Sequence, residues 1–258
     1  MIEYALMGAG GVLAGFLASL LGIGGGLFIV PWLNLVFGLP MHQAIAASLV
    51  AIIATSSGAS SVYLRNRFSD LKLGLSLGLA TVWGAICGGL AAGFLNAQVL
   101  SLLFSLVLIY AGGSMLKRPG GDSPEKEKST DYQIRNYPAG YGASFLAGNI
   151  SGLLGIGGGL VTVPVMHLVM RVPFKIASAT SSFMIGITGC ASAFLYYFRG
   201  EVNFLVTGTI VLGVLFGSNL GSFFLFRIKS SILRPVFAVI LLLMAFKMFL
   251  KGVNLGLF

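Results

Sequence analysis

The distribution of charged residues divides the chain into long apolar segments. Tyr4 to Leu64 is a run of 61 residues without one Asp, Glu, Lys or Arg, and Leu73 to Leu116 is a second such run of 44 residues. About 20 apolar residues are enough for a helix to cross the hydrocarbon core of a bilayer. The alternation of apolar and polar positions that is typical of barrel strands is missing from the sequence. The pattern therefore predicts an all-α polytopic membrane protein.

The sequence repeats itself with an offset of 133 residues. The heptapeptide LGIGGGL occupies positions 21–27 and again 154–160. The offset holds without gaps for some 50 residues and also pairs glycines further along the chain. It predicts a first transmembrane repeat over 1–116, a polar cytoplasmic linker over 117–137, and a second repeat over 138–258. The paired residues include Gly15 and Gly148, Pro31 and Pro164, Ser48 and Ser181, Thr55 and Thr188, Tyr63 and Tyr196, Gly84 and Gly217, and Gly88 and Gly221.

Each repeat contains three apolar stretches that are long enough to span a membrane. They cover 42–65, 71–95 and 98–116 in the first repeat, and 174–198, 203–227 and 231–250 in the second. The segment around the glycine motif has two interpretations, a broken helix that crosses the membrane or a hairpin that enters and leaves on one side. With hairpins, 13 basic residues lie on one face of the membrane and 3 on the other; with full crossings the split is 11 to 5.

The positive-inside rule favours the hairpins, with both termini outside. Three crossings per repeat is an odd number, so the second repeat is inserted upside down. The expected fold is thus two inverted homologous repeats, each a glycine-broken re-entrant helical hairpin plus three transmembrane helices, which makes eight membrane elements. Inverted repeats are common in secondary transporters, where the substrate site lies near the midplane between the repeats.

Composition removes several classes of protein. The chain is 57% hydrophobic and 9% charged, with a net charge of +9. The basic residues lie in the breaks between apolar segments, where they orient a membrane protein, so nucleic acid is not expected as a partner. The glycine runs lack the Lys-Ser/Thr ending of a nucleotide-binding loop, and no cofactor is expected. Cys87 and Cys190 lie in long apolar runs and are expected to be free, packed thiols.

The doubled Gly-Ile-Gly-Gly-Gly-Leu motif, with Val-Pro four residues after the last glycine of each copy, resembles the TauE/SafE sulfite exporter family. The resemblance covers nearly the whole chain, including the tandem halves and the polar central loop. It implies a transporter of the cell (inner) membrane that exports or imports a small sulfur-containing anion, such as sulfite, a sulfonate or thiosulfate.

The residues support an anion site by an independent route. Consecutive glycines allow a turn with positive φ inside the membrane and bring backbone N–H groups close to a ligand. Hydroxyl groups on the helix that follows each motif are neutral donors for an oxyanion. The glycines of Gly84-x-x-x-Gly88 and Gly217-x-x-x-Gly221 are instead interpreted as packing positions. The expected substrate-binding residues are Gly24, Gly25, Gly26, Gly157, Gly158, Gly159, Ser48, Ser181, Thr55 and Thr188.

Ionisable groups are scarce in the expected spans. Asn34 and His167 are repeat-equivalent, and with His42 they are candidates for the pathway or for proton coupling. No paired carboxylates or metal-ligand spacing are present, so an enzyme and a metal site are not expected. A passive anion channel built on the same helix ends remains the alternative to an alternating-access carrier. The lipid bilayer is an expected partner, and whether two protomers pair into a homodimer through their glycine faces is left open.

Overall fold

The structure is a computed structural model, and it describes residues 2–21, 24–65, 69–117, 132, 134–224 and 230–253. The described part is helical and contains no strand, as the apolar pattern predicts. The first half consists of α1 (Ile2–Leu21), α2 (Gly26–Pro31) with the π-helical turn η1 (Trp32–Val36), α3 (Met41–Arg65), α4 (Leu71–Ala92) and α5 (Ala97–Lys117). The second half consists of α6 (Tyr137–Leu154), α7 (Gly159–Pro164) with η2 (Val165–Val169), α8 (Phe174–Phe198), α9 (Phe204–Phe224) and α10 (Ser230–Gly252).

Five helices of the described part are long and apolar enough to cross a membrane. They are α3, α4, α5, α8 and α9, and each coincides with an expected stretch. The sixth expected stretch, 231–250, is occupied by α10. The segments Gly26–Val36 and Gly159–Val169 are apolar but shorter. The protein is therefore a multi-pass helical membrane protein, as its apolar runs predict.

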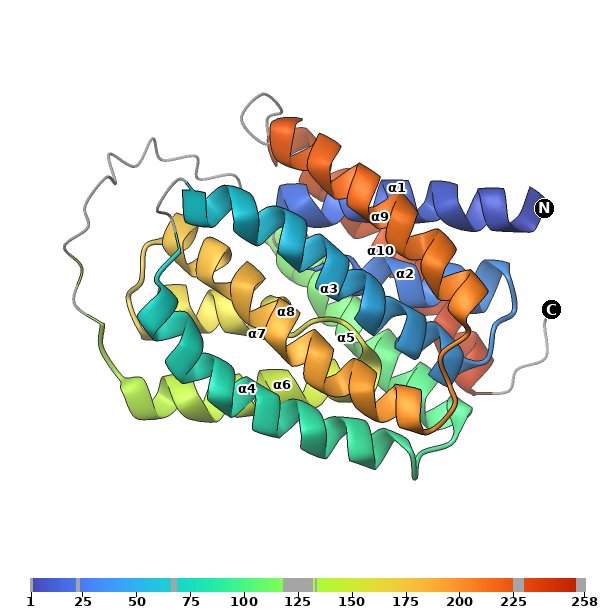
Figure 1. The fold of residues 1–258 in the computed structure, drawn as a ribbon, viewed down its shortest axis with the longest axis horizontal. Coiled ribbons are helices and arrows are strands. Elements are labelled where there is room, and N and C mark those ends of the chain that lie inside the picture. The colour runs from blue at the N-terminus through green and yellow to red at the C-terminus, as the bar shows by residue number, and fades with distance from the viewer. Residues whose placement is uncertain are drawn as a thin grey trace.

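Each glycine motif reverses the chain between a long helix and a short one. The chain runs along α1, turns at the glycines, and returns along α2 and η1 to the same end of the bundle; α6, α7 and η2 repeat this course (Figure 1). The first arms, α1 and α6, have 20 and 18 residues. They stay helical through several glycines because those glycines pack against neighbouring helices.

The second arm of each hairpin changes its helical register at a proline. Pro31 ends the α-helical part of α2 and Pro164 ends that of α7, and a π-helical turn follows each. Proline lacks a backbone N–H and its ring displaces the carbonyl four residues earlier, so the regular hydrogen-bond ladder cannot continue through it. A wider turn then takes over.

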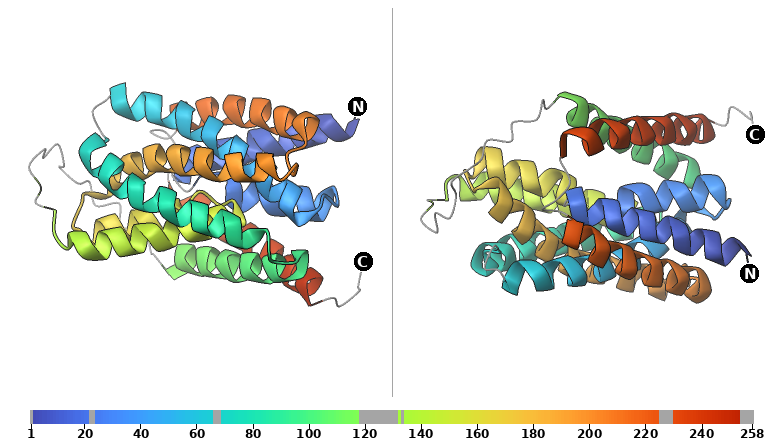
Figure 2. Two further views of the ribbon diagram at one scale, coloured as in Figure 1. Left: turned by 60° about the horizontal axis from the view of Figure 1, so that its bottom comes forward. Right: turned by 90° about the horizontal axis from the view of Figure 1, so that it is seen from above.

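The two halves pack mainly against each other. Helix α1 lies along α9 and α4 lies along α6, while α3 lies against α8 and α5 against α10. The repeat offset relates α1 to α6 and α9 to α4, so the pair α1–α9 is equivalent to the pair α6–α4. In each of the other two pairs, the two helices are equivalent to each other. This is the pattern that a two-fold relation between the halves produces. Figure 2 shows the resulting single bundle.

Glycines allow the two largest of these contacts. A Cβ atom added at Gly84 or Gly88 of α4 would run into backbone atoms of Phe145 or Asn149 in α6, and Gly148 and Gly152 of α6 are equally tight against α4. Gly217 of α9 meets α1 in the same way. The glycine faces of Gly84-x-x-x-Gly88 and Gly217-x-x-x-Gly221 are therefore occupied by helices of the same chain, which agrees with their interpretation as packing positions.

The bundle has two distinct ends. The linker end is the end at which α3, α5 and α9 finish and α4, α6, α8 and α10 begin, and the terminal end carries the first residues of α1 and the last of α10 (Figure 1).

The two cysteines are both free, and both are exposed on the outside of the bundle. The expectation that Cys87 and Cys190 are packed was wrong, because an apolar run gives no information on which face of a helix turns inward.

Candidate functional site

The two glycine turns meet at the centre of the bundle, between α3 and α8. Gly24 and Gly157 are repeat-equivalent and have φ of +76° and +86°. A Cβ on either of them would approach Ile185 Cγ2, at 3.4 Å and 3.0 Å. Gly26 is so close to the Gly155 carbonyl that a side chain would not fit between the turns. Positive φ and close backbone approach both require glycine here.

Two repeat-equivalent serines among the expected site residues support this region from α3 and α8. Ser48 and Ser181 are both fully buried. The Ser48 hydroxyl donates to the Gly155 carbonyl at 2.8 Å, and Ser181 Oγ lies 2.8 Å from Thr162 Oγ1. Both hydroxyls are thus engaged by the protein, and their contact with an anion stays a prediction.

A small pocket lies on one side of the turns and is lined from both halves. Its polar lining consists of hydroxyls from α1, α3 and α8 together with the backbone of Gly24, and it has room for little more than a water-sized molecule. The Ser56 hydroxyl donates to the Ser182 carbonyl at 2.6 Å, and that of Thr55 to the Ala51 carbonyl at 2.9 Å. Among the residues that the structure describes, no charged side chain contributes to the lining, which comprises Ala18, Ser19, Gly24, Thr55, Ser56, Ala59, Tyr63, Ser182 and Ile185.

The other expected site residues lie outside this pocket. Thr188, the equivalent of Thr55, donates to the Met184 carbonyl at 2.8 Å and lies 2.9 Å from Thr81 Oγ1. Gly25 and Gly158 precede the first residues of α2 and α7, which are Gly26 and Gly159. Of the six motif glycines expected to bind substrate, only Gly24 lines the pocket.

Asn34 and His167 make equivalent contacts at the ends of the two π-helical turns. Asn34 Nδ2 donates to the Leu39 carbonyl at 2.7 Å, and His167 Nδ1 lies 3.0 Å from the Val172 carbonyl. Leu39 and Val172 are themselves 133 residues apart, so both side chains close the same loop. His42 Nε2 lies 3.1 Å from the Ala92 carbonyl and ties the start of α3 to the end of α4.

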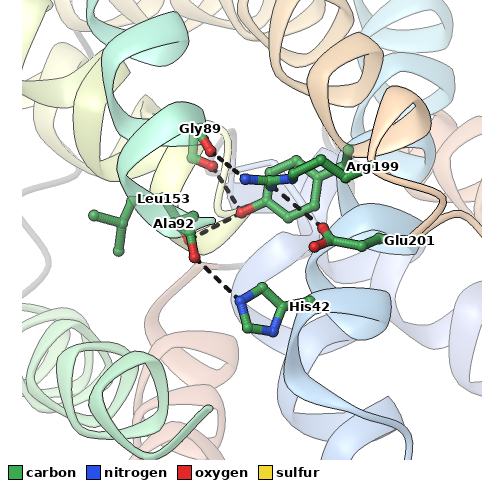
Figure 3. A network of polar contacts seen from close by, with 8 residues as sticks. His42, Gly89, Ala92, Leu153, Arg199 and Glu201 are labelled. Carbon is green, nitrogen blue, oxygen red and sulfur yellow. Dashed lines mark hydrogen bonds and ion pairs between the residues drawn. The ribbon is translucent and has the colours of Figure 1, made fainter. Parts of the chain in front are cut away.

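A second polar cluster, at the terminal end, joins α4, α6 and α8 (Figure 3). Arg199 Nη1 donates to the Gly89 carbonyl at 2.8 Å, and Arg199 Nη2 lies 3.3 Å from Glu201 Oε2. The guanidinium carbon lies 4.2 Å from the centre of the Tyr196 ring. The Tyr196 hydroxyl lies 3.1 Å from the Gly152 carbonyl and 3.3 Å from that of Leu153. We call Tyr196, Arg199 and Glu201 the terminal-end cluster.

Sequence reasoning missed the terminal-end cluster and part of the pocket lining. Tyr63 and Tyr196 stood out only as a repeat pair, and Arg199 and Glu201 as charges at the end of a span. A signal was available, because Arg199 and Glu201 have opposite charge and stand two positions apart at the end of an expected span. Within the described residues, no group of three His, Cys, Asp or Glu side chains is placed to hold a metal ion.

Comparison with known proteins places the chain in a family. The family model for the sulfite exporter TauE/SafE matches residues 7–248. A probable membrane transporter protein of Bacillus subtilis, YunE, is 27% identical over 94% of this chain and 96% of its own length. A probable membrane transporter protein of Xylella fastidiosa is 28% identical over 93% and 92%, and MJ0441 of Methanocaldococcus jannaschii, also a probable membrane transporter protein, is 27% identical over 93% of each. No solved structure matches. With its doubled glycine motif, its helical bundle and a match over nearly its whole length, the chain belongs to the TauE/SafE family of membrane transporters.

Proposed function

We propose that this protein is a secondary transporter that moves a small sulfur-containing oxyanion of the sulfite, sulfonate or thiosulfate class across the cytoplasmic membrane by alternating access. The observation that carries the proposal is the pocket at the junction of the two halves. Hydroxyls of Thr55 and Ser56 from the first half and Ser182 from the second converge there beside the Gly24 turn. Hydroxyl and backbone donors without a competing carboxylate suit an anion.

The helix packing supports the inverted arrangement on which alternating access depends. In that arrangement the hairpins α1–α2 and α6–α7 enter from opposite sides of the membrane, and their glycine turns meet near the midplane. Gly24, Gly25 and Gly26 and their equivalents Gly157, Gly158 and Gly159 then form the two walls of the passage. Ser48 and Ser181 hold these walls in position in the state seen here, through the Gly155 carbonyl and the Thr162 hydroxyl, and Thr188 binds Thr81 of α4 instead.

The test is transport by the purified protein in proteoliposomes. Uptake is measured for sulfite, thiosulfate, taurine, isethionate and sulfate, with and without a pH gradient. We expect saturable uptake of at least one sulfur oxyanion, which a gradient drives against its own concentration difference. Flux that never saturates and only follows the electrochemical gradient would instead identify a channel, and no flux of any anion in the panel would overturn the proposed substrate class.

Two variants connect transport to the pocket. Thr55→Val and Ser56→Ala each remove one hydroxyl from its wall, and we expect each to raise KM by about tenfold, because a hydrogen bond to a charged group contributes about 1.5–3 kcal/mol. Ser105→Ala is the control, since Ser105 is equally buried and its hydroxyl donates to the Leu102 carbonyl within α5. Equal KM values in all three variants would place the substrate elsewhere.

A further inference from the structure

The pocket follows one face of α3. Thr55, Ala59 and Tyr63 lie on successive turns of this helix, and all three line the pocket. Positions four residues apart lie above one another on a helix. The repeat offset converts this stripe into Thr188, Ser192 and Tyr196 of α8, and it converts the pocket residue Ala18 into Ser151 of α6. The second half thus carries the same stripe on the way to the terminal end.

The second stripe is closed in this structure, because all three of its residues are buried. Tyr63 is partly exposed, whereas Tyr196 has no exposed surface and its hydroxyl faces the carbonyls of α6. Ser151 and Ser192 are also fully buried. Their hydroxyls find no hydrogen-bond partner among the described residues. A buried hydroxyl without a partner is costly, and such a group in a native structure needs an explanation.

The terminal-end cluster lies over the closed stripe. Arg199 comes seven residues after Ser192 and three after Tyr196, so it continues the same face of α8. Its bond to the Gly89 carbonyl fastens the end of α8 to α4, and its ion pair with Glu201 lies within the loop that follows α8 (Figure 3). The first half does not encode this ion pair, because the positions equivalent to Arg199 and Glu201 are Asn66 and Phe68.

We propose that Ser151, Ser192 and Arg199 form a second binding site for a small oxyanion. This second site is the repeat-equivalent of the pocket, and Tyr196 closes it in the state seen here. This inference rests on the proposed function and adds a substrate station on the terminal side. The buried hydroxyls of Ser151 and Ser192 gain their missing partner when the anion enters. The pocket of the first half is then the station on the linker side.

The charge of Arg199 explains why an anion opens this end. The Arg199–Glu201 ion pair is partly exposed at this end, with 26% and 21% of the side-chain surface accessible, so a solute that enters from the terminal side meets the guanidinium. An oxyanion replaces the carboxylate on the guanidinium, since both accept hydrogen bonds from the same planar donors. A neutral solute offers no such compensation, so the ion pair selects for negative charge.

Thiol labelling tests the two stations separately in the full-length protein. Cys87 and Cys190 are replaced by serine, and either Ala59→Cys or Ser192→Cys is then introduced. These two positions are repeat-equivalent. The probe is a methanethiosulfonate reagent that carries a sulfonate group, applied to right-side-out and to inverted membrane vesicles. We expect Ala59→Cys to react from the linker side and Ser192→Cys to react slowly, from the terminal side alone.

Second substitutions open the closed end. Tyr196→Ala or Glu201→Gln should accelerate the reaction of Ser192→Cys by about tenfold, because each removes contacts that hold the end shut, and should leave its sidedness unchanged. Sulfate or isethionate should slow this reaction in the Tyr196→Ala background. Protection should be lost on adding Arg199→Gln and retained with Arg199→Lys.

Three outcomes at Ser192→Cys would overturn the inference: labelling from the linker side, no acceleration in either opened variant while Ala59→Cys reacts, or no protection by either anion. An unreactive Ala59→Cys would also overturn it, since the two stations would then not be equivalent sites of the two repeats. These readouts need no transport. If no anion is transported in proteoliposomes, the proposed function is overturned, but the labelling pattern can still identify two stations. Conversely, transport can be observed while the labelling pattern overturns the second station.

Discussion

Individual residues of the glycine motif are required for different reasons. Gly158 has a φ of +70°, and a Cβ there would lie 3.2 Å from the Ala147 carbonyl oxygen. Gly25 has a negative φ of −17°, and its Cβ would meet the Ile29 Cδ1 atom at 3.3 Å. A side chain at Gly158 is therefore strained by the backbone as well as crowded, at a cost of about 1–3 kcal/mol. At Gly25 the neighbour is the end of a flexible side chain.

We predict that Gly158→Val lowers the melting temperature more than Gly25→Val does, and that both weaken anion binding to folded protein. Binding is measured on purified variants, at temperatures equally far below each Tm. Gly113→Ala is the control, since nothing lies within 4 Å of its added Cβ. If both valine variants bind the anion as the wild type does, the motif glycines serve packing alone.

A residue before α6 makes stability depend on pH. The Tyr132 hydroxyl donates to Asp70 Oδ2 at 2.6 Å, and Asp70 also caps the first turn of α4 through the Leu73 N–H. Burial raises the pKa of Tyr132 above its usual value of 10.0, and the hydrogen bond to the Asp70 carboxylate raises it further. The neutral phenol is thus favoured in the folded state, so its stabilisation is complete below about pH 10 and declines as the pH rises above that value.

The measurement is the difference in Tm between the wild type and Tyr132→Phe. We expect the wild type to be more stable by a constant amount from about pH 7 to pH 9, and this advantage to shrink at higher pH. Tyr141→Phe, an exposed tyrosine of α6, should show no such difference. A gap that grows above pH 10 would contradict the assigned hydrogen bond.

At the scale of elements, stability depends on two helix pairs that glycines bring into contact. We predict that Gly84→Ala in α4 and Gly217→Ala in α9 each destabilise the protein by about 1–3 kcal/mol, because the added methyl group would overlap the backbone of the facing helix. Gly78→Ala and Gly208→Ala, on the same two helices, have open space at the added Cβ. Thermal unfolding in detergent should separate the two sets. Equal Tm values for Gly84→Ala and Gly78→Ala would show that α4 and α6 are not in contact as described.

At the scale of the whole molecule, the charge distribution predicts an orientation in the membrane. The basic residues gather at the linker end, so that end is expected in the cytoplasm and both termini outside. In a cysteine-free background, an impermeant maleimide added to intact cells should label Phe258→Cys and Asn96→Cys but not Asp122→Cys. Positions 122 and 258 lie outside the described residues, whereas Asn96 is in the α4–α5 loop at the terminal end. Labelling at position 122 would reverse the orientation.

Much of the fold could be predicted from the sequence, and less of the site. The helices appear as apolar runs, and the turns as glycines with positive φ at Gly24 and Gly157. The length of α1 was not predicted, because its glycines weaken an isolated helix and only contact with α9 shows why they are tolerated. Among the expected site residues, Thr55 and Gly24 line the pocket, while Ser48 and Ser181 lie outside its lining.

The sequence by itself determined the helical membrane class, the duplication and the family, because hydrophobic length and a repeat with constant offset are properties of the chain read in one dimension. Only the tertiary structure decided which helices pair across the halves, and that the repeat pair Tyr63 and Tyr196 has two different environments. Tyr63 lines a pocket and Tyr196 closes one, although the offset makes them equivalent. The physical reason is that Arg199 lies over the Tyr196 ring and carbonyls of α6 accept from its hydroxyl, whereas the sequence has Asn66 at the position equivalent to Arg199.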